Sequence, residues 1–166
     1  MTAFASLIAD FAAAWCANDA PAVTALFDTG DPEVACLFAD AVDPAIGAAA
    51  CAAAVEARCA AIGQHVYTPR EILTRDLGPD LAAAFFLIER AWVARAGTDH
   101  AGTRLGQKAR ATLVARRIGT AWRIAHYAEA PVAPLLELQA YYQNVAADGL
   151  DAIPPRPWAK TSRSPS

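Results

Sequence analysis

The sequence predicts an α+β fold in which three N-terminal helices pack on a strongly curved antiparallel sheet, with a further helix near the C-terminus. The prediction rests on a change of periodicity along the chain. Up to about residue 62 the apolar side chains recur at helical spacing, whereas from Pro69 onwards they alternate with a period of two. Helices followed by a meander of strands are typical of an α+β domain rather than of alternating parallel units.

Three helices are expected in the first part of the chain. The first runs from Thr2 to about Asn18, and residues 18–21 (NDAP) end it and start a short second helix. An edge strand is expected over residues 34–42. The third helix runs from Pro44 to Ile62, before Gly63. The apolar stripe of the first helix consists of Phe4, Leu7, Ile8, Phe11 and Trp15.

The second part of the chain reads as strands. Residues 70–77 and 81–95 form two of them, and residues 109–131 form a hairpin that turns at Gly119. Pairing Val114 with Ile124 gives one face of the hairpin that also carries Trp122, and this face is interpreted as the core face. Strand alternation then directs three polar side chains into the core, namely Arg110, Thr112 and His126. The opposite face is marked as outward by Arg117, Arg123 and Glu129.

The hairpin also carries a family resemblance. The segment RATLVARRIGTAWRIAHYAEA resembles the last hairpin of the SnoaL-like branch of the nuclear transport factor 2-like superfamily, where Arg-Arg precedes a short turn and Trp-Arg-Ile-x-His follows it. The order of elements over residues 2–130 resembles the superfamily as well. The resemblance implies a cone with one open end. Because that superfamily hosts enzymes, binding proteins and association domains, the fold by itself does not name a function.

Composition narrows the classes of function. The formal net charge is −3, so the chain lacks the basic footprint of a nucleic-acid-binding protein. No stretch of about 18 uncharged apolar residues is present, and the N-terminus lacks the basic start of a signal peptide. The four cysteines have no metal-ligand spacing, and neither His65 nor His100 has a second ligand nearby. We therefore expect a cytoplasmic protein without a metal or cofactor.

Three segments are expected. Residues 1–131 form the SnoaL-like domain, residues 132–150 form an amphipathic helix that packs on it, and residues 151–166 form a proline-rich and polar tail. The outward face of the hairpin is expected to form a homodimer. That face includes Leu113, Ala115, Ala125 and Tyr127.

Asp43 is the first candidate catalytic residue. The stretch LFADAVDPAIG resembles the ketosteroid isomerase branch, in which a strand ends in Asp-Pro-x-x-Gly and the aspartate removes a proton beside a carbonyl. The resemblance implies that Asp43 is a general base, and a carboxylate at the rim of an apolar cavity suits that role. However, Phe11 stands where that branch has a tyrosine, and Thr112 or Leu113 where it has an acid. The alternative is that Asp43 caps the third helix, with Pro44 at its first position.

His126 is the second catalytic candidate, because in relatives a histidine at the end of this strand faces the cavity. It could donate to a substrate oxygen or pass a proton, or it could simply bond Thr112 across the hairpin. Arg110 is predicted to meet Glu89 as an inward ion pair and to anchor a ligand. The alternatives are a structural pair, or a register in which Glu89 is exposed.

The cavity is expected to bind a small apolar or carboxylate-bearing molecule. Its predicted lining comprises Arg110, Glu89, Thr112, Phe11, Trp15, Trp92 and Tyr142. Two alternatives remain open. One is a cofactor-independent lyase, isomerase or cyclase with Asp43 as the base, and the other is a dimeric association domain.

Overall fold

A computed structural model describes residues 3–98 and 101–132 of the chain. The helices of this part are α1 (Ala3–Cys16), α2 (Ala20–Ala25) and α3 (Ala48–Ala61). The strands are β1 (Ala35–Leu37), β2 (Ala45–Ile46), β3 (Ile62–Gly78), β4 (Leu81–Ala94), β5 (Arg104–Ile118) and β6 (Ala121–Pro131). The predicted C-terminal helix with Tyr142, and the tail after it, lie outside the described residues.

The helices form where the sequence predicts them, with one change of boundary. The apolar stripe of α1 is buried, and the Asp19 side chain caps α2 by accepting from the Ala22 amide at 3.0 Å. Helix α3 begins at Ala48, later than predicted. Its N-cap is Gly47 with φ of 89°, a conformation that glycine adopts without strain. The alternative in which Asp43 caps this helix is therefore wrong.

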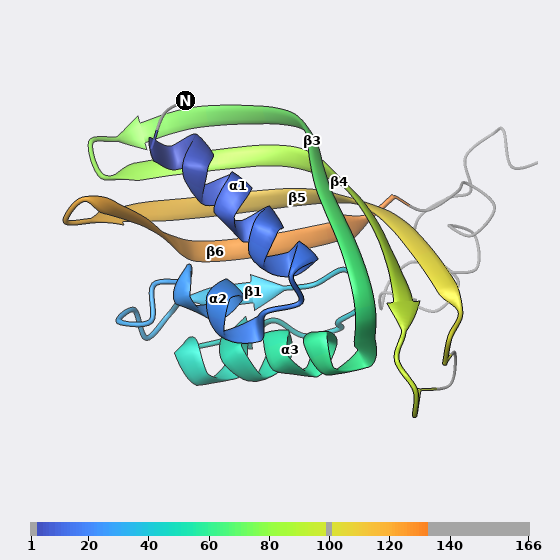
Figure 1. Cartoon of the computed structure of the whole chain (residues 1–166). Coiled ribbons are helices and arrows are strands. Elements are labelled where there is room, and N and C mark those ends of the chain that lie inside the picture. The colour runs from blue at the N-terminus through green and yellow to red at the C-terminus, as the bar shows by residue number, and fades with distance from the viewer. Residues whose placement is uncertain (1–2, 99–100, 133–166) are drawn as a thin grey trace, which may run out of the picture. The chain divides into compact units, whose positions relative to one another are not determined.

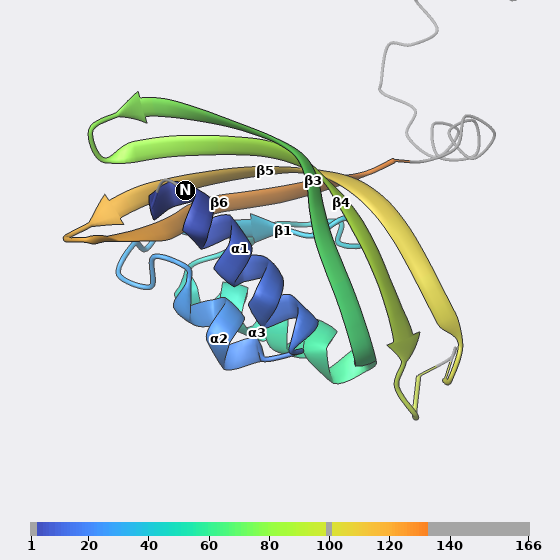
Figure 2. The same ribbon diagram turned by 45° about the horizontal axis from the view of Figure 1, so that its top comes forward.

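The strands form a single six-stranded sheet in the order β2-β1-β6-β5-β4-β3. The pairs among β3 to β6 are antiparallel, whereas β1 runs parallel to β6, so the sheet is mixed rather than wholly antiparallel. The expected edge strand is also inside the sheet, because β2 pairs with its outer side. Figures 1 and 2 show the long strands β3 to β5 arching over α1, which lies across the concave face.

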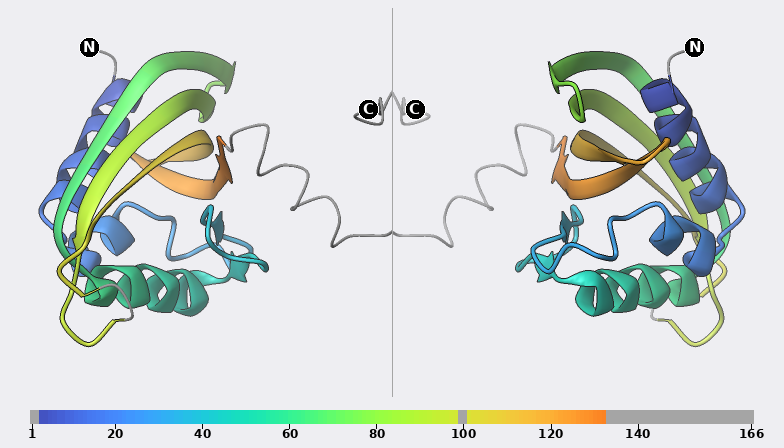
Figure 3. Two further views of the ribbon diagram at one scale, coloured as in Figure 1. Left: turned by 90° about the vertical axis from the view of Figure 1, so that its right-hand side faces the viewer. Right: turned by 90° about the vertical axis from the view of Figure 1, so that its left-hand side faces the viewer.

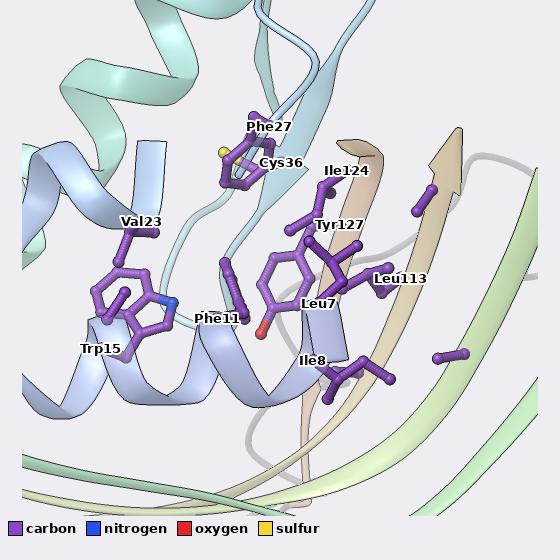
Figure 4. Packing of buried hydrophobic residues seen from close by; sticks show 14 of the residues in the cluster. Leu7, Ile8, Phe11, Trp15, Val23, Phe27, Cys36, Leu113, Ile124 and Tyr127 are labelled. Atoms are coloured by element: carbon purple, nitrogen blue, oxygen red, sulfur yellow. The ribbon is translucent and has the colours of Figure 1, made fainter. Parts of the chain in front are cut away.

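The core lies between this concave face and the helices. Figure 3 shows the sheet curling around α1, α2 and α3. The rings of Phe11 from α1 and Tyr127 from β6 meet in the middle, with centroids 5.0 Å apart (Figure 4). Leu113 and Ala115 of β5 are fully buried against the same cluster. The α+β architecture predicted from periodicity is confirmed.

The predicted facing of the last hairpin is wrong, for two reasons: a bulge in β6 and a turn register that differs from the predicted one by one residue. Val114 pairs with His126, but the next residue, Ala115, pairs with Ile124, so Ala125 is an extra residue on β6. Because of this extra residue, Ile124 and Tyr127 both point into the core although they are three positions apart. Strand alternation counted from Ile124 therefore assigns the later residues of β6 to the wrong faces. The register of the turn adds a second error, because Ile118 pairs with Ala121 and Ile124 with Ala115 rather than with Val114, which reverses the predicted faces of β5.

No helix within the described residues is long and apolar enough to cross a membrane.

Candidate functional site

The hairpin residues predicted to line the cavity lie elsewhere. Arg110, Thr112 and His126 are exposed on the face of the sheet that points away from the helices. Their strand neighbours Ala111, Leu113 and Tyr127 occupy the concave side instead, and those three are fully buried. The prediction that Arg110, Thr112 and His126 point into the core is therefore wrong. The bulge at Ala125 turns His126 outward, whereas Arg110 and Thr112 face outward because Ile124 pairs with Ala115 rather than with Val114.

Asp43 and Glu89 also lie away from the cavity. The side chain of Asp43 is exposed in the segment between β1 and β2. Glu89 pairs with Lys108 across the strands and contacts its Nζ at 2.9 Å, so it does not meet Arg110. Lys108, followed by Arg70, lowers the pKa of the Glu89 carboxyl. The alternative register, in which Glu89 faces outward, is the observed one.

The concave side of the sheet holds a cavity of about 240 Å³ next to the end of α1. Two of the predicted lining residues, Trp15 and Trp92, border it, whereas Phe11 is packed in the core beneath. The remaining borders come from β1–β2, α3 and the long strands. The full lining consists of Trp15, Asp40, Arg58, Ala61, Ile62, His65, Arg90, Trp92 and Gln107.

His65 is the titratable side chain best placed for chemistry in this cavity. Its Nδ1 lies 3.0 Å from the backbone carbonyl oxygen of Trp15. A carbonyl only accepts, so Nδ1 carries the proton and Nε2 of the neutral ring has a free lone pair. Burial lowers the pKa of His65, an effect that the Trp15 carbonyl opposes and the Arg90 charge reinforces. The ring is therefore neutral near pH 7.

Two buried polar atoms of the cavity lining have no partner among the described residues. They are Nε2 of His65, an acceptor, and Nε1 of Trp15, a donor. The two rings are perpendicular, with centroids 5.8 Å apart. Leaving a buried polar group unsatisfied costs about 1–3 kcal/mol, and such groups usually meet a ligand or water.

Arg90 brings a cation to the cavity wall. Its guanidinium bonds Gln107 through Nε at 2.8 Å and also through Nη2, and Nη2 lies 3.2 Å from a carboxylate oxygen of Glu129. Its Nη1 donates to no other described residue, which leaves a donor available to the cavity. Glu129, predicted to point outward, is buried behind this arginine.

A directed chain of hydrogen bonds continues from Glu129 into the core. The Tyr127 hydroxyl donates to Glu129 at 2.6 Å, and its oxygen lies 2.8 Å from the Tyr67 hydroxyl. Because Tyr127 already donates to Glu129, Tyr67 is the donor in the second bond. Burial raises the pKa of both phenols well above their usual range, with the Glu129 charge adding to the effect. Both phenols therefore remain donors at any ordinary pH.

A second ion pair closes the cavity on the side of α3. Arg58 contacts Asp40 at 2.5 Å, donates to the Ala54 carbonyl at 3.0 Å, and lies 4.0 Å from the ring centroid of Phe38. Packing of a guanidinium on an aromatic face holds the charge in place. Arg58 and Asp40 thus form a neutral, fixed wall of the cavity.

Sequence reasoning missed His65, Arg90 and Glu129 as site residues. The signal for Arg90 was present, because it shares strand parity with Phe86, Ile88 and Trp92, all of which are apolar. The predicted strand begins at residue 70, whereas β3 begins at Ile62. A strand that began at Ile62 would have placed His65 and Tyr67 on the same face of the sheet. No residue pattern in the sequence predicts the bulge at Ala125, which turns Glu129 inward.

Comparison with known proteins places the fold. The model of the SnoaL-like domain matches residues 5–134. A nuclear transport factor 2-like superfamily protein from Salmonella enterica is 17% identical, with a TM-score of 0.68 over 80% of this chain and 90% of that one. An uncharacterized protein with a cystatin-like fold from Caulobacter vibrioides is 20% identical, with a TM-score of 0.65 over 86% and 96%.

A ketosteroid isomerase-like protein from Erwinia carotovora is also similar, at 17% identity and a TM-score of 0.63 over 78% of this chain and 94% of that one. No curated protein matches the sequence. At these identities the solved structures establish a shared fold and no shared activity.

Proposed function

The chain belongs to the SnoaL-like domain family, and from that premise we propose that its cavity binds a small, mostly apolar molecule that carries an oxygen function. The observation that carries the proposal is the pair of unpartnered atoms, Nε1 of Trp15 and Nε2 of His65. They offer one donor and one acceptor in a lining that combines Trp92, Ala61 and Ile62 with the polar side chains of two ion-paired arginines and Gln107. Ligand pockets typically combine an apolar wall with a few convergent polar groups in this way.

The size of the cavity suggests the size of the ligand. An apolar cavity of about 150 Å³ holds a benzene molecule. A cavity of about 240 Å³ therefore suits a benzene ring with one small substituent. A carbonyl oxygen on such a ring would accept from Trp15 or from Nη1 of Arg90.

Acetophenone is a suitable probe, and the indole N–H resonances of ¹⁵N-labelled protein give the readout. We expect acetophenone to shift the resonance of Trp15, assigned through W15F, and to leave that of Trp122 in place. Trp122 packs against Phe4, with ring centroids 5.4 Å apart, away from the cavity. The variant H65F should weaken binding, whereas W122F should not. A Trp15 resonance that is unmoved at millimolar probe would overturn the proposed function.

A second function is favoured by the state of His65. A neutral imidazole with a free lone pair can act as a general base, and a nearby arginine can stabilise an enolate oxygen. We propose on this ground that a cofactor-independent isomerase, lyase or cyclase reaction would use His65 rather than Asp43 as its base. Arg90 would then hold the developing charge.

Hydrogen exchange into acetophenone in D₂O tests this second function. His65 would take a methyl proton to give the enolate, and deuterium from solvent would replace it at the same carbon. We expect the wild type to accelerate loss of the methyl proton signal, H65Q to abolish the acceleration, and D43N to retain it. Acceleration that survives in H65Q but is lost in D43N would return the role to Asp43.

A further inference from the structure

We propose that Glu129 sets the charge preference of the cavity, so that it accepts an uncharged ring compound with a carbonyl or hydroxyl oxygen and rejects the matching carboxylate. The inference deepens the proposed function and rests on it. It narrows the class of ligand from apolar or carboxylate-bearing molecules to uncharged ones. It also assigns a role to a buried carboxylate that does not itself border the cavity.

The first step is the balance of charge around the cavity. The two cations in its wall, Arg58 and Arg90, each face a carboxylate, Asp40 and Glu129 respectively. Two positive and two negative groups cancel, and the buried His65 is neutral near pH 7. The wall thus has several hydrogen-bond donors but no net charge to compensate a ligand anion.

The second step is that Glu129 is fixed as an acceptor. Its Oε2 accepts from the Ala39 amide at 3.1 Å and from Arg90, and its Oε1 accepts from the Tyr127 hydroxyl at 2.6 Å. Every contact requires a donor on the other side, as suits an ionised carboxylate. With a side chain only 1% exposed, Glu129 is screened very little by solvent.

The third step follows from electrostatics in a poorly solvated site. A ligand carboxylate that accepted from Arg90 would bring a second anion close to Glu129 and leave the pair of anions with one cation. Burying an uncompensated charge is strongly unfavourable. A carbonyl or hydroxyl oxygen can accept the same bond without that penalty, because it carries no net charge.

Acetophenone and benzoate form a matched pair of probes. Both carry a carbonyl group on a benzene ring, and the methyl group of acetophenone is replaced by a negatively charged oxygen in benzoate. Both are titrated at pH 7.5, with the Trp15 indole resonance as readout. We expect wild-type protein to bind acetophenone at least about tenfold more tightly than benzoate. In E129Q one negative charge beside the cavity is lost. The ratio of the dissociation constants of benzoate and acetophenone should therefore fall by about tenfold or more relative to the wild type.

E89Q is the matched control. It makes the same substitution and the same change in net charge at the neighbour of Arg90 on the opposite face, where Glu89 pairs with Lys108. In E89Q the ratio of the two dissociation constants should stay within about twofold of the wild-type ratio, because solvent and salt screen exposed charges.

The outcomes separate the two proposals. If neither probe moves the Trp15 resonance of the wild type, the proposed function fails, and the inference fails with it. If acetophenone binds but benzoate binds equally well or better in the wild type, only the charge preference is overturned, and this result does not depend on whether E129Q folds. If folded E129Q keeps the wild-type ratio, or E89Q shifts it as much, Glu129 is not the determinant.

Discussion

Burial decides which titratable side chains of this chain can react. The order strand, aspartate, proline predicts Asp43 as a catalytic base, yet its side chain is exposed. The sequence does not single out His65 as a catalytic residue, yet burial keeps its ring neutral and the Trp15 carbonyl fixes its tautomer. A motif reports which residue types stand together, but the environment that shifts a pKa comes from segments far away in the sequence.

The pH dependence of stability should reveal the burial of His65. Its pKa is lowered in the folded state from an ordinary value of 6.5. Above that value both states hold a neutral ring. Below it the unfolded chain binds a proton at His65 and the folded chain does not. The free energy of unfolding therefore decreases as the pH is lowered, until the pKa of the folded state is reached.

We therefore expect the melting temperature of the wild type to fall more steeply between pH 7.5 and 5.5 than that of H65Q. Thermal melts at matched ionic strength measure the difference. Equal slopes for the two proteins would show that His65 has an unperturbed pKa.

The thiols differ in reactivity for the same reason. Burial raises the pKa of Cys36 to about 12, with the nearby Cys51 adding to the effect, and burial also raises the pKa of Cys51 and Cys59. The thiolate is the reactive form, and only Cys16 is exposed among the four cysteines. Brief treatment with iodoacetamide at pH 8 should modify Cys16 in the folded protein and all four cysteines in urea. Peptide mass spectrometry gives the sites, and rapid labelling of Cys36 in the folded state would contradict the expectation.

At the scale of the element, the sequence predicts where strands and turns occur better than which way they face. The hairpin turn at Gly119 is present, with φ of 61°. The facing of β6 after Ile124 depends on one extra residue, Ala125, and alanine carries no signal of a bulge. Because strand alternation is strict, this one residue moved Glu129 and Tyr127 from the predicted outer face to the core, and His126 the other way.

The hydrogen-bond chain that links β3 to β6 has a direction, and the direction predicts unequal losses. Y127F removes the donor to Glu129 and the acceptor of Tyr67, leaving two buried groups unsatisfied. Y67F removes only a donor to Tyr127. Each unsatisfied buried group costs about 1–3 kcal/mol, and more when it is charged.

We therefore expect Y127F to lower the free energy of unfolding by several kcal/mol and Y67F by about 1–2 kcal/mol. Urea denaturation followed by circular dichroism measures both. Equal losses, or a larger loss for Y67F, would mean that the chain does not end on an ionised Glu129.

At the scale of the whole domain, the family and the α+β order were predictable from the sequence because they depend on coarse features, namely the shift of periodicity and the hairpin motif. The mixed character of the sheet was not. The parallel pairing of β1 with β6 joins residues about ninety positions apart, Ala35 with His126 for example. No local pattern encodes a pairing of that range. Glu129 depends on this pairing, because the amide of Ala39, two residues after β1, donates to its Oε2 at 3.1 Å.

The predicted homodimer needs a different set of residues from those proposed by sequence. Leu113, Ala115 and Tyr127 are fully buried beneath the helices and cannot contact a partner. The outer face of the sheet instead exposes apolar side chains from neighbouring strands. Leu73 of β3, 68% exposed, pairs with Phe85 of β4, 44% exposed. Thr112 of β5 pairs with Phe85 on its other side.

We expect the chain to form a dimer through this outer face, because contiguous apolar patches on a soluble domain usually mark an interaction surface. F85E should convert the dimer to a monomer, since it would place a charge in the buried centre of the interface. I118E is the matched control, because Ile118 is 48% exposed but stands at the hairpin turn. Size-exclusion chromatography with light scattering at micromolar concentration gives the mass. A wild type that is monomeric there, or a dimer that survives F85E, would exclude this face as the interface.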